Sequence, residues 1–279
     1  MGLRVHHLNC GTMCPRGRRF VNGDGGLLAA GRMVCHCLLI ETDQGLVLID
    51  SGLGLADVNR PAATLSLGFR LLVRPRLHAE ETAIRQVERL GYRPEDVRHI
   101  VLTHLDVDHA GGIRDFPWAT VHVHAREYER AMLGATANER QRYRSQQWVH
   151  GPDWATYTEV GESWFGFNAV RELSGLPPQI LLVPLAGHTL GHAGVAVDTG
   201  STWLLHAGDA YMFHGEIEPE SRATPGLSLF QNLLQVDPDA RRRNLVRLRD
   251  LRAAHGDEVE IFSAHDHLEL ARYAQAPTN

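Results

Sequence analysis

The stretch His104–Gly112, HLDVDHAGG, constrains the fold of this chain more than any other part of the sequence. It follows the apolar run RHIVLT and places two imidazoles and two carboxylates within six residues: His104, Asp106, Asp108 and His109. Groups crowded in this way repel or desolvate one another unless a cation compensates their charge. Gly111 and Gly112 would let the backbone turn tightly beside them. The stretch therefore predicts a metal-binding turn at the end of a buried strand.

Three further candidate ligands follow other predicted strands. His188 comes after QILLVPLAG, Asp209 after TWLLHAG and His265 after EVEIFSA. Strand ends are where α/β proteins gather functional groups, and imidazole with carboxylate suits zinc and other first-row divalent metals. Seven candidate ligands exceed the four that one tetrahedral ion takes. The sequence therefore favours two ions over one.

Strand and helix patterns are interspersed along the chain. The β-rich runs MVCHCLLIET and GLVLIDSG, separated by the turn TDQG, predict a hairpin. AEETAIRQVERLGY predicts a helix that stops at Gly91, and Asp237 with Pro238 predicts the start of another. The segments Leu53–Leu77 and Asn138–Gly175 fit neither pattern clearly. Because no repeat or low-complexity linker divides the chain, we expect one layered α/β domain over residues 1–279.

Composition and charge limit the classes of partner that this protein is expected to bind. The formal net charge of −5 argues against nucleic acid, because phosphate binding needs a dense cationic face. No apolar run is long enough to span a bilayer, and the first ten residues, MGLRVHHLNC, lack the apolar core of a secretory signal. We therefore expect a cytoplasmic protein that binds neither nucleic acid nor a membrane.

The four cysteines all lie in the first 37 residues, at Cys10, Cys14, Cys35 and Cys37. With nearby histidines they could form a zinc site, but CxxxC followed by CxC is no common zinc-ribbon spacing. Cys35 and Cys37 also alternate within a predicted strand. Small buried thiols are the interpretation that base rates of cysteine burial favour.

The stretch THLDVDHAGG resembles the HxHxDH signature of the metallo-β-lactamase fold superfamily. LVLIDSG, GHTLGH, LLHAGDA and SAHD match the supporting motifs in order, so the resemblance runs from about Val34 to His267. It implies a four-layered αβ/βα sandwich with a metal site at one edge of its two sheets. It also implies a role for each candidate: His104, Asp106 and His188 on the first ion, Asp108, His109 and His265 on the second, Asp209 bridging both, and Asp50 orienting a ligand.

Asp106 departs from the signature, because most hydrolases of this family carry histidine at that position. An extra carboxylate lowers the Lewis acidity of the first ion and makes manganese or iron plausible beside zinc. The family's flavin-linked diiron oxidases also use a carboxylate there. A diiron redox enzyme or oxygen sensor of the same fold therefore stays open as an alternative function.

The leading hypothesis is a dinuclear metal-dependent hydrolase that uses a metal-bridging hydroxide, since two divalent ions can hold such a hydroxide at neutral pH. Asp108 is the carboxylate best placed to handle a proton, although it could be purely a ligand. Tyr211, two residues after Asp209, resembles a tyrosine of the quorum-quenching N-acyl homoserine lactonases that helps hold the substrate carbonyl, with a spacing one residue shorter. Packing is the other interpretation of Tyr211. The ending AHDHLE also looks like those lactonases, so a lactone or related ester is the expected substrate and a phosphodiester the alternative.

Three of the five tryptophans, Trp148, Trp154 and Trp164, fall in the segment Asn138–Gly175. They could form walls above the metals that suit an apolar tail of the substrate. A homodimer interface or a local core would use the same residues, and the sequence leaves these interpretations open. For His192 and His206, which lie near proposed ligands, packing or orientation of a ligand is the favoured interpretation.

Overall fold

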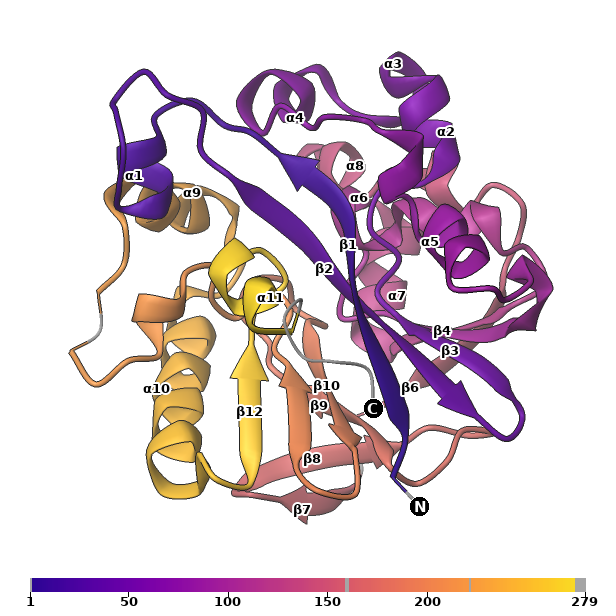
Figure 1. The fold of residues 1–279 in the computed structure, drawn as a ribbon. Coiled ribbons are helices and arrows are strands. Elements are labelled where there is room, and N and C mark those ends of the chain that lie inside the picture. Colours follow the sequence, from indigo (N-terminus) through magenta and orange to yellow (C-terminus); the bar gives the residue numbers. More distant parts are fainter. Residues whose placement is uncertain (1, 159–160, 221, 274–279) are drawn as a thin grey trace.

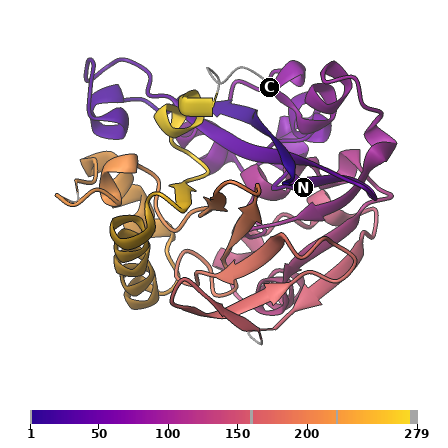
Figure 2. The same ribbon diagram turned by 60° about the horizontal axis from the view of Figure 1, so that its bottom comes forward.

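The computed structural model describes residues 2–158, 161–220 and 222–273. Two β-sheets face each other, and helices lie on the outer side of each sheet (Figures 1 and 2). The first sheet has the order β1 (Arg4–Met13), β2 (Met33–Thr42), β3 (Gly45–Ile49), β4 (Val97–Val101), β5 (Thr120–His124) and β6 (Asp153–Tyr157). The second has the order β12 (Val259–Phe262), β11 (Trp203–His206), β10 (Ala193–Asp198), β9 (Ile180–Pro184), β8 (Phe167–Glu172) and β7 (Glu162–Trp164).

Both sheets are mixed, and their parallel pairs matter for the site. In the first sheet β1 to β3 pair antiparallel, whereas β3, β4, β5 and β6 run parallel. In the second sheet the pairs from β7 to β11 are antiparallel, and β11 pairs parallel with β12. Parallel neighbours end at the same edge of a sheet, so the loops after them lie close together.

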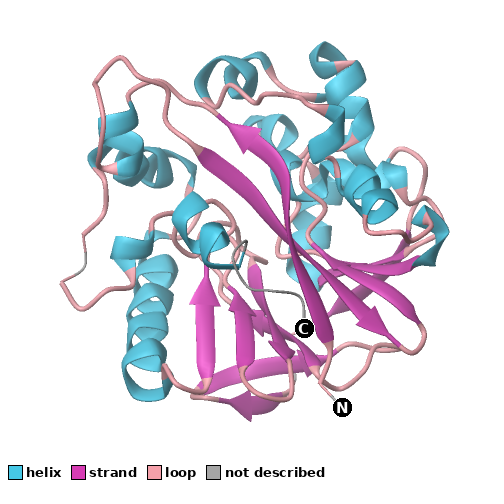
Figure 3. Ribbon diagram, in the orientation of Figure 1, coloured by secondary structure: helices cyan, strands magenta, loops and turns pink. Residues whose placement is uncertain are grey.

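The helices lie outside the sheets, as the colouring of Figure 3 shows. The α-helices are α1 (Arg18–Asn22), α2 (Leu55–Asn59), α3 (Pro61–Thr64), α4 (Leu67–Leu72), α5 (Ala83–Arg89), α6 (Val107–Ala110), α7 (Ala125–Leu133), α8 (Ala137–Arg142), α9 (Pro225–Leu234), α10 (Pro238–His255) and α11 (His267–Tyr273). Short 3-10 helices are η1 (Ala79–Glu81), η2 (Pro94–Asp96), η3 (Gly111–Asp115), η4 (Ser145–Trp148) and η5 (His214–Glu216). Within the described ranges, none of the helices combines the length and apolarity that crossing a membrane requires.

The core is layered in the way that the alternation of side chains along a strand dictates. Leu38 and Ile40 of β2 point between the sheets and pack in one cluster with Leu182 and Val195 of the second sheet. Leu39, between them, points to the opposite face and joins the cluster beneath the helices that cover the first sheet. Because β2 is buried on both faces, its sequence is an almost continuous apolar run. The order of layers is helix, sheet, sheet, helix, which confirms the predicted αβ/βα sandwich.

Several local predictions are confirmed. β2 and β3 form the expected hairpin. The carboxylate of Asp237 accepts hydrogen bonds from the backbone N–H groups of Asp239 and Ala240 and so caps α10. Leu245, Leu248 and Leu251 of this helix pack on the second sheet. The helix predicted from AEETAIRQVERLGY begins only at Ala83, because its first residues form the 3-10 helix η1.

Candidate metal centre

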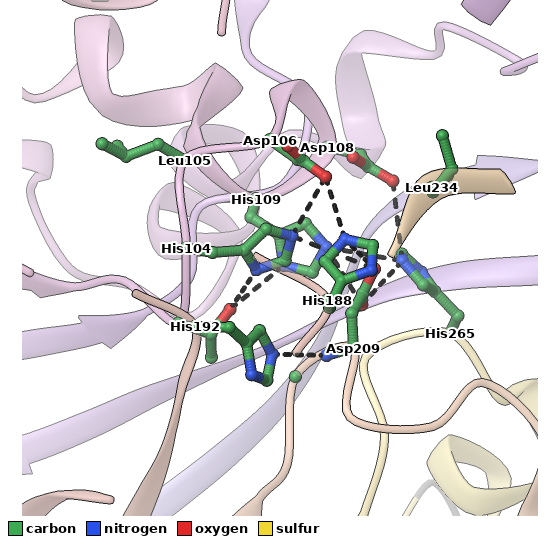
Figure 4. A network of polar contacts seen from close by, with 12 residues as sticks. His104, Leu105, Asp106, Asp108, His109, His188, His192, Asp209, Leu234 and His265 are labelled. Atoms are coloured by element: carbon green, nitrogen blue, oxygen red, sulfur yellow. Dashed lines mark hydrogen bonds and ion pairs between the residues drawn. The ribbon is translucent and has the colours of Figure 1, made fainter. Parts of the chain in front are cut away.

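The seven predicted ligands converge at one edge of the two sheets (Figure 4). His104 follows β4, His188 follows β9, Asp209 follows β11 and His265 follows β12. The two sheets are joined at this edge by backbone hydrogen bonds, including His36 N–H to the carbonyl of Ala264 at 2.8 Å. The convergence therefore follows from the strand directions and from the way in which the sheets meet.

The first cluster contains His104, His188 and Asp209. Nε2 of His188 lies 3.3 Å from Oδ2 of Asp209, and Nε2 of His104 lies 3.9 Å from the same oxygen. Oδ2 of Asp106 lies 3.0 Å from Nε2 of His188 and 3.4 Å from Nε2 of His104. Asp106 therefore contributes one of its oxygens to the edge of this cluster.

The second cluster contains Asp108, His109 and His265, and it also reaches Asp209. Nε2 of His109 and Nε2 of His265 lie 3.4 Å apart. Oδ1 of Asp209 lies 3.3 Å from the first and 3.1 Å from the second, and Oδ2 of Asp108 lies 3.6 Å from His265. The two oxygens of Asp209 thus face different clusters.

These spacings fit a metal ion in each cluster. Ligand atoms about 2.0–2.1 Å from a tetrahedral zinc ion lie roughly 3.3 Å from one another. The eight separations given above, 3.0–3.9 Å in the first cluster and 3.1–3.6 Å in the second, bracket that value, and the ligand atoms of each group of three lie within 4.8 Å of one another. Nε2 of His104 and Oδ1 of Asp209 are also buried without a hydrogen-bond partner. Such atoms are costly unless something binds them, and a cation does so for both.

Asp50 orients His109 of the second cluster by contacting the ring nitrogen that faces away from the cluster. Its Oδ2 lies 2.8 Å from Nδ1 of His109, so the other ring nitrogen is left for the cluster. The same carboxylate accepts hydrogen bonds from the backbone N–H and the hydroxyl of Thr103. Burial alone would raise the pKa of Asp50, but the charge and hydrogen bond of His109 outweigh it and lower the pKa to about 2. The backbone φ of 53° at Asp50 is rare for a residue other than glycine and is typical of a functional site.

The two loops that carry ligands from different sheets are tied together by Glu127 of α7. This buried carboxylate accepts a hydrogen bond from the backbone N–H of Leu105 at 3.0 Å and from that of Gly191 at 3.3 Å. It thereby holds the HLDVDH loop against the GHTLGH loop. The positions of His104 and His188 relative to each other depend on this shared acceptor.

Gly111 and Gly112 have a role that differs from the predicted one. Gly111 has an ordinary helical φ of −60°, so the turn itself does not demand glycine. A Cβ atom at Gly111 would lie 2.4 Å from Oδ2 of Asp57, and one at Gly112 would lie 2.6 Å from the carbonyl oxygen of Ser51. The two glycines therefore allow the metal loop to pack closely on the loop after β3.

Arg142, at the end of α8, is a third residue of this site, after Thr103 and Glu127, that the sequence did not predict. Its Nε and Nη2 bind the two oxygens of Asp106 at 2.6 and 2.7 Å, and Nη2 also lies 2.5 Å from Nε2 of His188. The charge of Arg142, together with His104, lowers the pKa of Asp106 well below its usual value although burial acts in the other direction. Burial and the same guanidinium lower the pKa of His188 to about 4. His188 is therefore neutral at physiological pH, the form of imidazole that binds a metal.

Tyr211 lies in the core of the second sheet. Its side chain is fully buried, and its hydroxyl donates to the carboxylate of Glu269, 3.0 Å from Oε1. Burial raises the pKa of Tyr211 well above its usual value. These contacts match the packing interpretation, and the catalytic role of Tyr211 stays a prediction.

Other groups near the site are accounted for by packing. His192 accepts a hydrogen bond from the backbone N–H of Asp209 and lies 2.9 Å from the carbonyl of Leu185. Nε2 of His206 lies 2.6 Å from the carbonyl of His36. Both histidines therefore brace the loops through these contacts. The four cysteines are free thiols, three of them buried, as expected.

The tryptophans of Asn138–Gly175 divide between two cores. Trp148 joins the cluster of the first sheet and lies edge to face with Trp154. Trp164 joins the cluster of the second sheet and packs against Trp203. The local-core interpretation is thus the one that their contacts support, and a homodimer stays a prediction.

The fold and the two His/Asp clusters define a metallo-hydrolase. The model of the metallo-beta-lactamase superfamily matches residues 30–254, so the chain belongs to this superfamily.

Its relatives include two mycobacterial proteins described as probable metallo-hydrolases, Mb2322c of Mycobacterium bovis and Rv2300c of Mycobacterium tuberculosis. Each is 44% identical over 264 residues, which is 95% of this chain and 80% of the relative. An N-acyl homoserine lactonase of Bacillus sp is 26% identical over 58% of each chain. A solved N-acyl homoserine lactone hydrolase, with its product N-hexanoyl-L-homoserine at the catalytic metal centre, superposes with a TM-score of 0.72 at 21% identity, over 98% of this chain and 97% of that one. The predicted fold class and family are therefore confirmed.

Proposed function

We propose that this protein is a dinuclear zinc hydrolase that opens a lactone or a related ester. The observation that carries the proposal is the position of Asp209, whose two oxygens face two separate ligand clusters with tetrahedral spacing. Because a carboxylate has two oxygens, Asp209 can bind one ion in each cluster at the same time. Imidazole and carboxylate ligands suit zinc, with manganese and iron as the other candidates.

Each residue has a proposed role toward the ions. The first would be held by His104, His188 and one oxygen of Asp106, the second by Asp108, His109 and His265, and Asp209 would bind both. When bound, the ions would lower the pKa of a water molecule toward neutrality and polarise the substrate carbonyl. Asp50, Thr103 and Glu127 keep the ligands oriented.

Proton transfer falls to Asp108 in this proposal. In lactone hydrolysis the oxygen of water bonds to the carbonyl carbon, the ring C–O bond breaks, and a proton passes to the departing alkoxide to give a hydroxy acid. The side chain of Asp108 is 14% exposed, whereas that of Asp209 is only 4% exposed. Of these two carboxylates Asp108 is therefore the one that a substrate can reach.

The substrate class is supported by the relatives and by the surroundings of the clusters. Proteins similar to this chain include N-acyl homoserine lactonases, one of them a dizinc enzyme called AidC that superposes with a TM-score of 0.61. Leu234, at the end of α9, lies beside the clusters in Figure 4 and is 36% exposed. An exposed leucine at this place suits a substrate with an apolar acyl tail.

Arg142 weakens the argument for a diiron redox enzyme. It depended on the extra negative charge of Asp106, and the guanidinium of Arg142 binds both oxygens of that carboxylate. The net charge around the first cluster is then the same as with a neutral ligand. Hydrolysis is therefore the function that this geometry supports best.

The experiment is a turnover panel with the protein stripped of metal and reloaded with zinc. Lactones with acyl chains of increasing length, open-chain aryl esters and phosphodiesters serve as substrates. We expect the highest kcat/KM for a lactone, by at least about tenfold over any phosphodiester, and no turnover before zinc is returned. Preferred hydrolysis of phosphodiesters, or no hydrolysis by protein that holds two ions, would contradict the proposal.

A further inference from the structure

Arg142 is held in place by four oxygen acceptors at the edge of the first cluster. Besides the two oxygens of Asp106, its Nη1 donates to the carbonyl of Leu234 at 2.8 Å and to that of His188 at 3.3 Å. These partners come from the metal loop, from the end of α9 and from the loop after β9. The side chain is only 15% exposed. A guanidinium with this many well-aligned acceptors has one defined orientation.

Asp106 is shared between this guanidinium and the first cluster. Its Oδ1 binds Nε of Arg142, and its Oδ2 lies within 3.4 Å of the ligand nitrogens of both His104 and His188. Oδ2 also accepts a hydrogen bond from Nη2 of Arg142 at 2.7 Å, so the pairing fixes the direction in which this oxygen faces the cluster. It also cancels the charge of Asp106, so the pair adds no net charge beside the first ion.

The positive charge of Arg142 can also weaken metal binding at the first cluster. Nη2 of Arg142 lies 2.5 Å from Nε2 of His188, a nitrogen of the first cluster. A positive charge this close opposes a divalent cation unless a carboxylate lies between them. The same arginine thus helps the site when residue 106 is aspartate and harms it when residue 106 is neutral.

We propose that Arg142 is a positioning residue that forms one functional unit with Asp106 and sets the affinity of the first metal ion. This inference rests on the proposed dinuclear centre. It assigns to α8, which leads into the segment Asn138–Gly175, a direct connection to the candidate metal ligands. It also predicts that residues 106 and 142 can be exchanged only together.

The test is a set of variants whose metal affinities are measured by competition with a chromogenic chelator, using zinc alone as the probe. Asp108→Ala, which removes a ligand of the second cluster only, assigns the two binding steps. Arg142→Lys keeps the positive charge but loses the bidentate hydrogen bonding to Asp106. We therefore expect zinc affinity at the first cluster to fall about 10–100-fold. Arg140→Lys is the matched control, because Arg140 lies on the same helix and donates to the carbonyl of Gly134 at the surface.

The decisive comparison is between Asp106→His and the double variant Asp106→His with Arg142→Met. We expect the single variant to lose at least about tenfold in affinity for the first zinc, and the double variant to return to within about threefold of the parent protein. The visible ligand-field absorption of cobalt in the first cluster should disappear and return in parallel.

Three outcomes are distinguishable. Two ions in the parent protein together with rescue in the double variant supports the inference. Two ions in the parent but the same first-cluster affinity in the parent and in the variants at residues 106 and 142, or a double variant as weak as Asp106→His, overturns the inference and leaves the proposed function intact. A parent protein that binds a single zinc overturns both.

Discussion

Oδ2 of Asp50 lies 2.8 Å from Nδ1 of His109 and so directs the opposite nitrogen of that ring into the second cluster. Neither residue can do this alone, because the imidazole needs a partner to fix its orientation and its tautomer. The backbone φ of 53° at Asp50 accompanies this contact, as sparsely populated backbone conformations often do at functional sites.

Asp50→Asn should therefore weaken metal binding at the second cluster. Asparagine keeps the size of the side chain but loses the charge, and the expected loss is about 10–100-fold in zinc affinity or in kcat/KM. Chelator competition measures it, with the exposed Asp43→Asn as the control. Unchanged affinity in correctly folded Asp50→Asn would show that the hydrogen bond to His109 has no such role.

Replacement of the shared carboxylate should affect both ions, whereas replacement of a ligand of one cluster should affect one. Asp209→Ala is expected to lose both ions and to lower turnover by at least about a thousandfold, the effect of removing a main electrostatic group. His109→Ala is expected to lose the second ion and to abolish turnover. Elemental analysis of the purified variants decides this, and normal turnover in either variant would refute the assignment of two metals.

Tyr211→Phe separates packing from catalysis. We expect turnover within about twofold of the parent protein, because the hydroxyl donates to Glu269 in the core. We also expect the free energy of unfolding to fall by about 1–3 kcal/mol, since the buried carboxyl of Glu269 loses a partner. Denaturant titration and steady-state rates test the two halves. A large loss of kcat with normal stability would instead support the catalytic role predicted for Tyr211.

Acid should destabilise the folded chain through His7. Its ring stacks on Tyr273 with 3.6 Å between centroids, and burial, with the neighbouring His206 and His6, lowers its pKa to about 3. Between pH 6.5 and about 3, His7 is protonated in the unfolded chain but neutral in the folded chain. The free energy of unfolding therefore falls as pH decreases toward 3. The slope from this residue is at most about 1.4 kcal/mol per pH unit.

His7→Phe keeps the stacking surface and removes the titration. In metal-free protein, we expect the stability difference between parent and variant to shift in favour of the variant as pH decreases from 7 to 4. Denaturant titrations at several pH values measure it. A difference that stays constant over this range would contradict the neutral state of the partly buried His7.

The sequence predicted that these seven side chains lie together, because each of them follows a strand that is apolar enough to recognise. His188, Asp209 and His265 are far apart in the chain, but β9, β11 and β12 run in the same direction and end at one edge of the sheet. The pairing of β4 with β3 similarly explains why Asp50 reaches His109. Each of these motifs is short and can be recognised locally in the sequence, and the strand topology then brings their side chains together.

Arg142 could not be predicted in the same way. It lies 36 residues after Asp106 in a segment without clear periodicity, and it is one of 28 arginines in a chain without lysine. The only signal in the sequence was the extra carboxylate at Asp106. A buried carboxylate needs a positively charged partner, but the sequence does not show which residue supplies it. The helices α2 to α4 were missed because each has only four to six residues, too few to show a helical period.

The central claim is that Asp209 joins two metal sites in a hydrolase. The most direct measurement is elemental analysis of the protein as purified, on the sample whose lactone turnover is recorded. The account predicts about two divalent ions per chain, zinc foremost, in protein that hydrolyses a lactone. A single ion per chain, or two irons in protein that hydrolyses nothing, would contradict it.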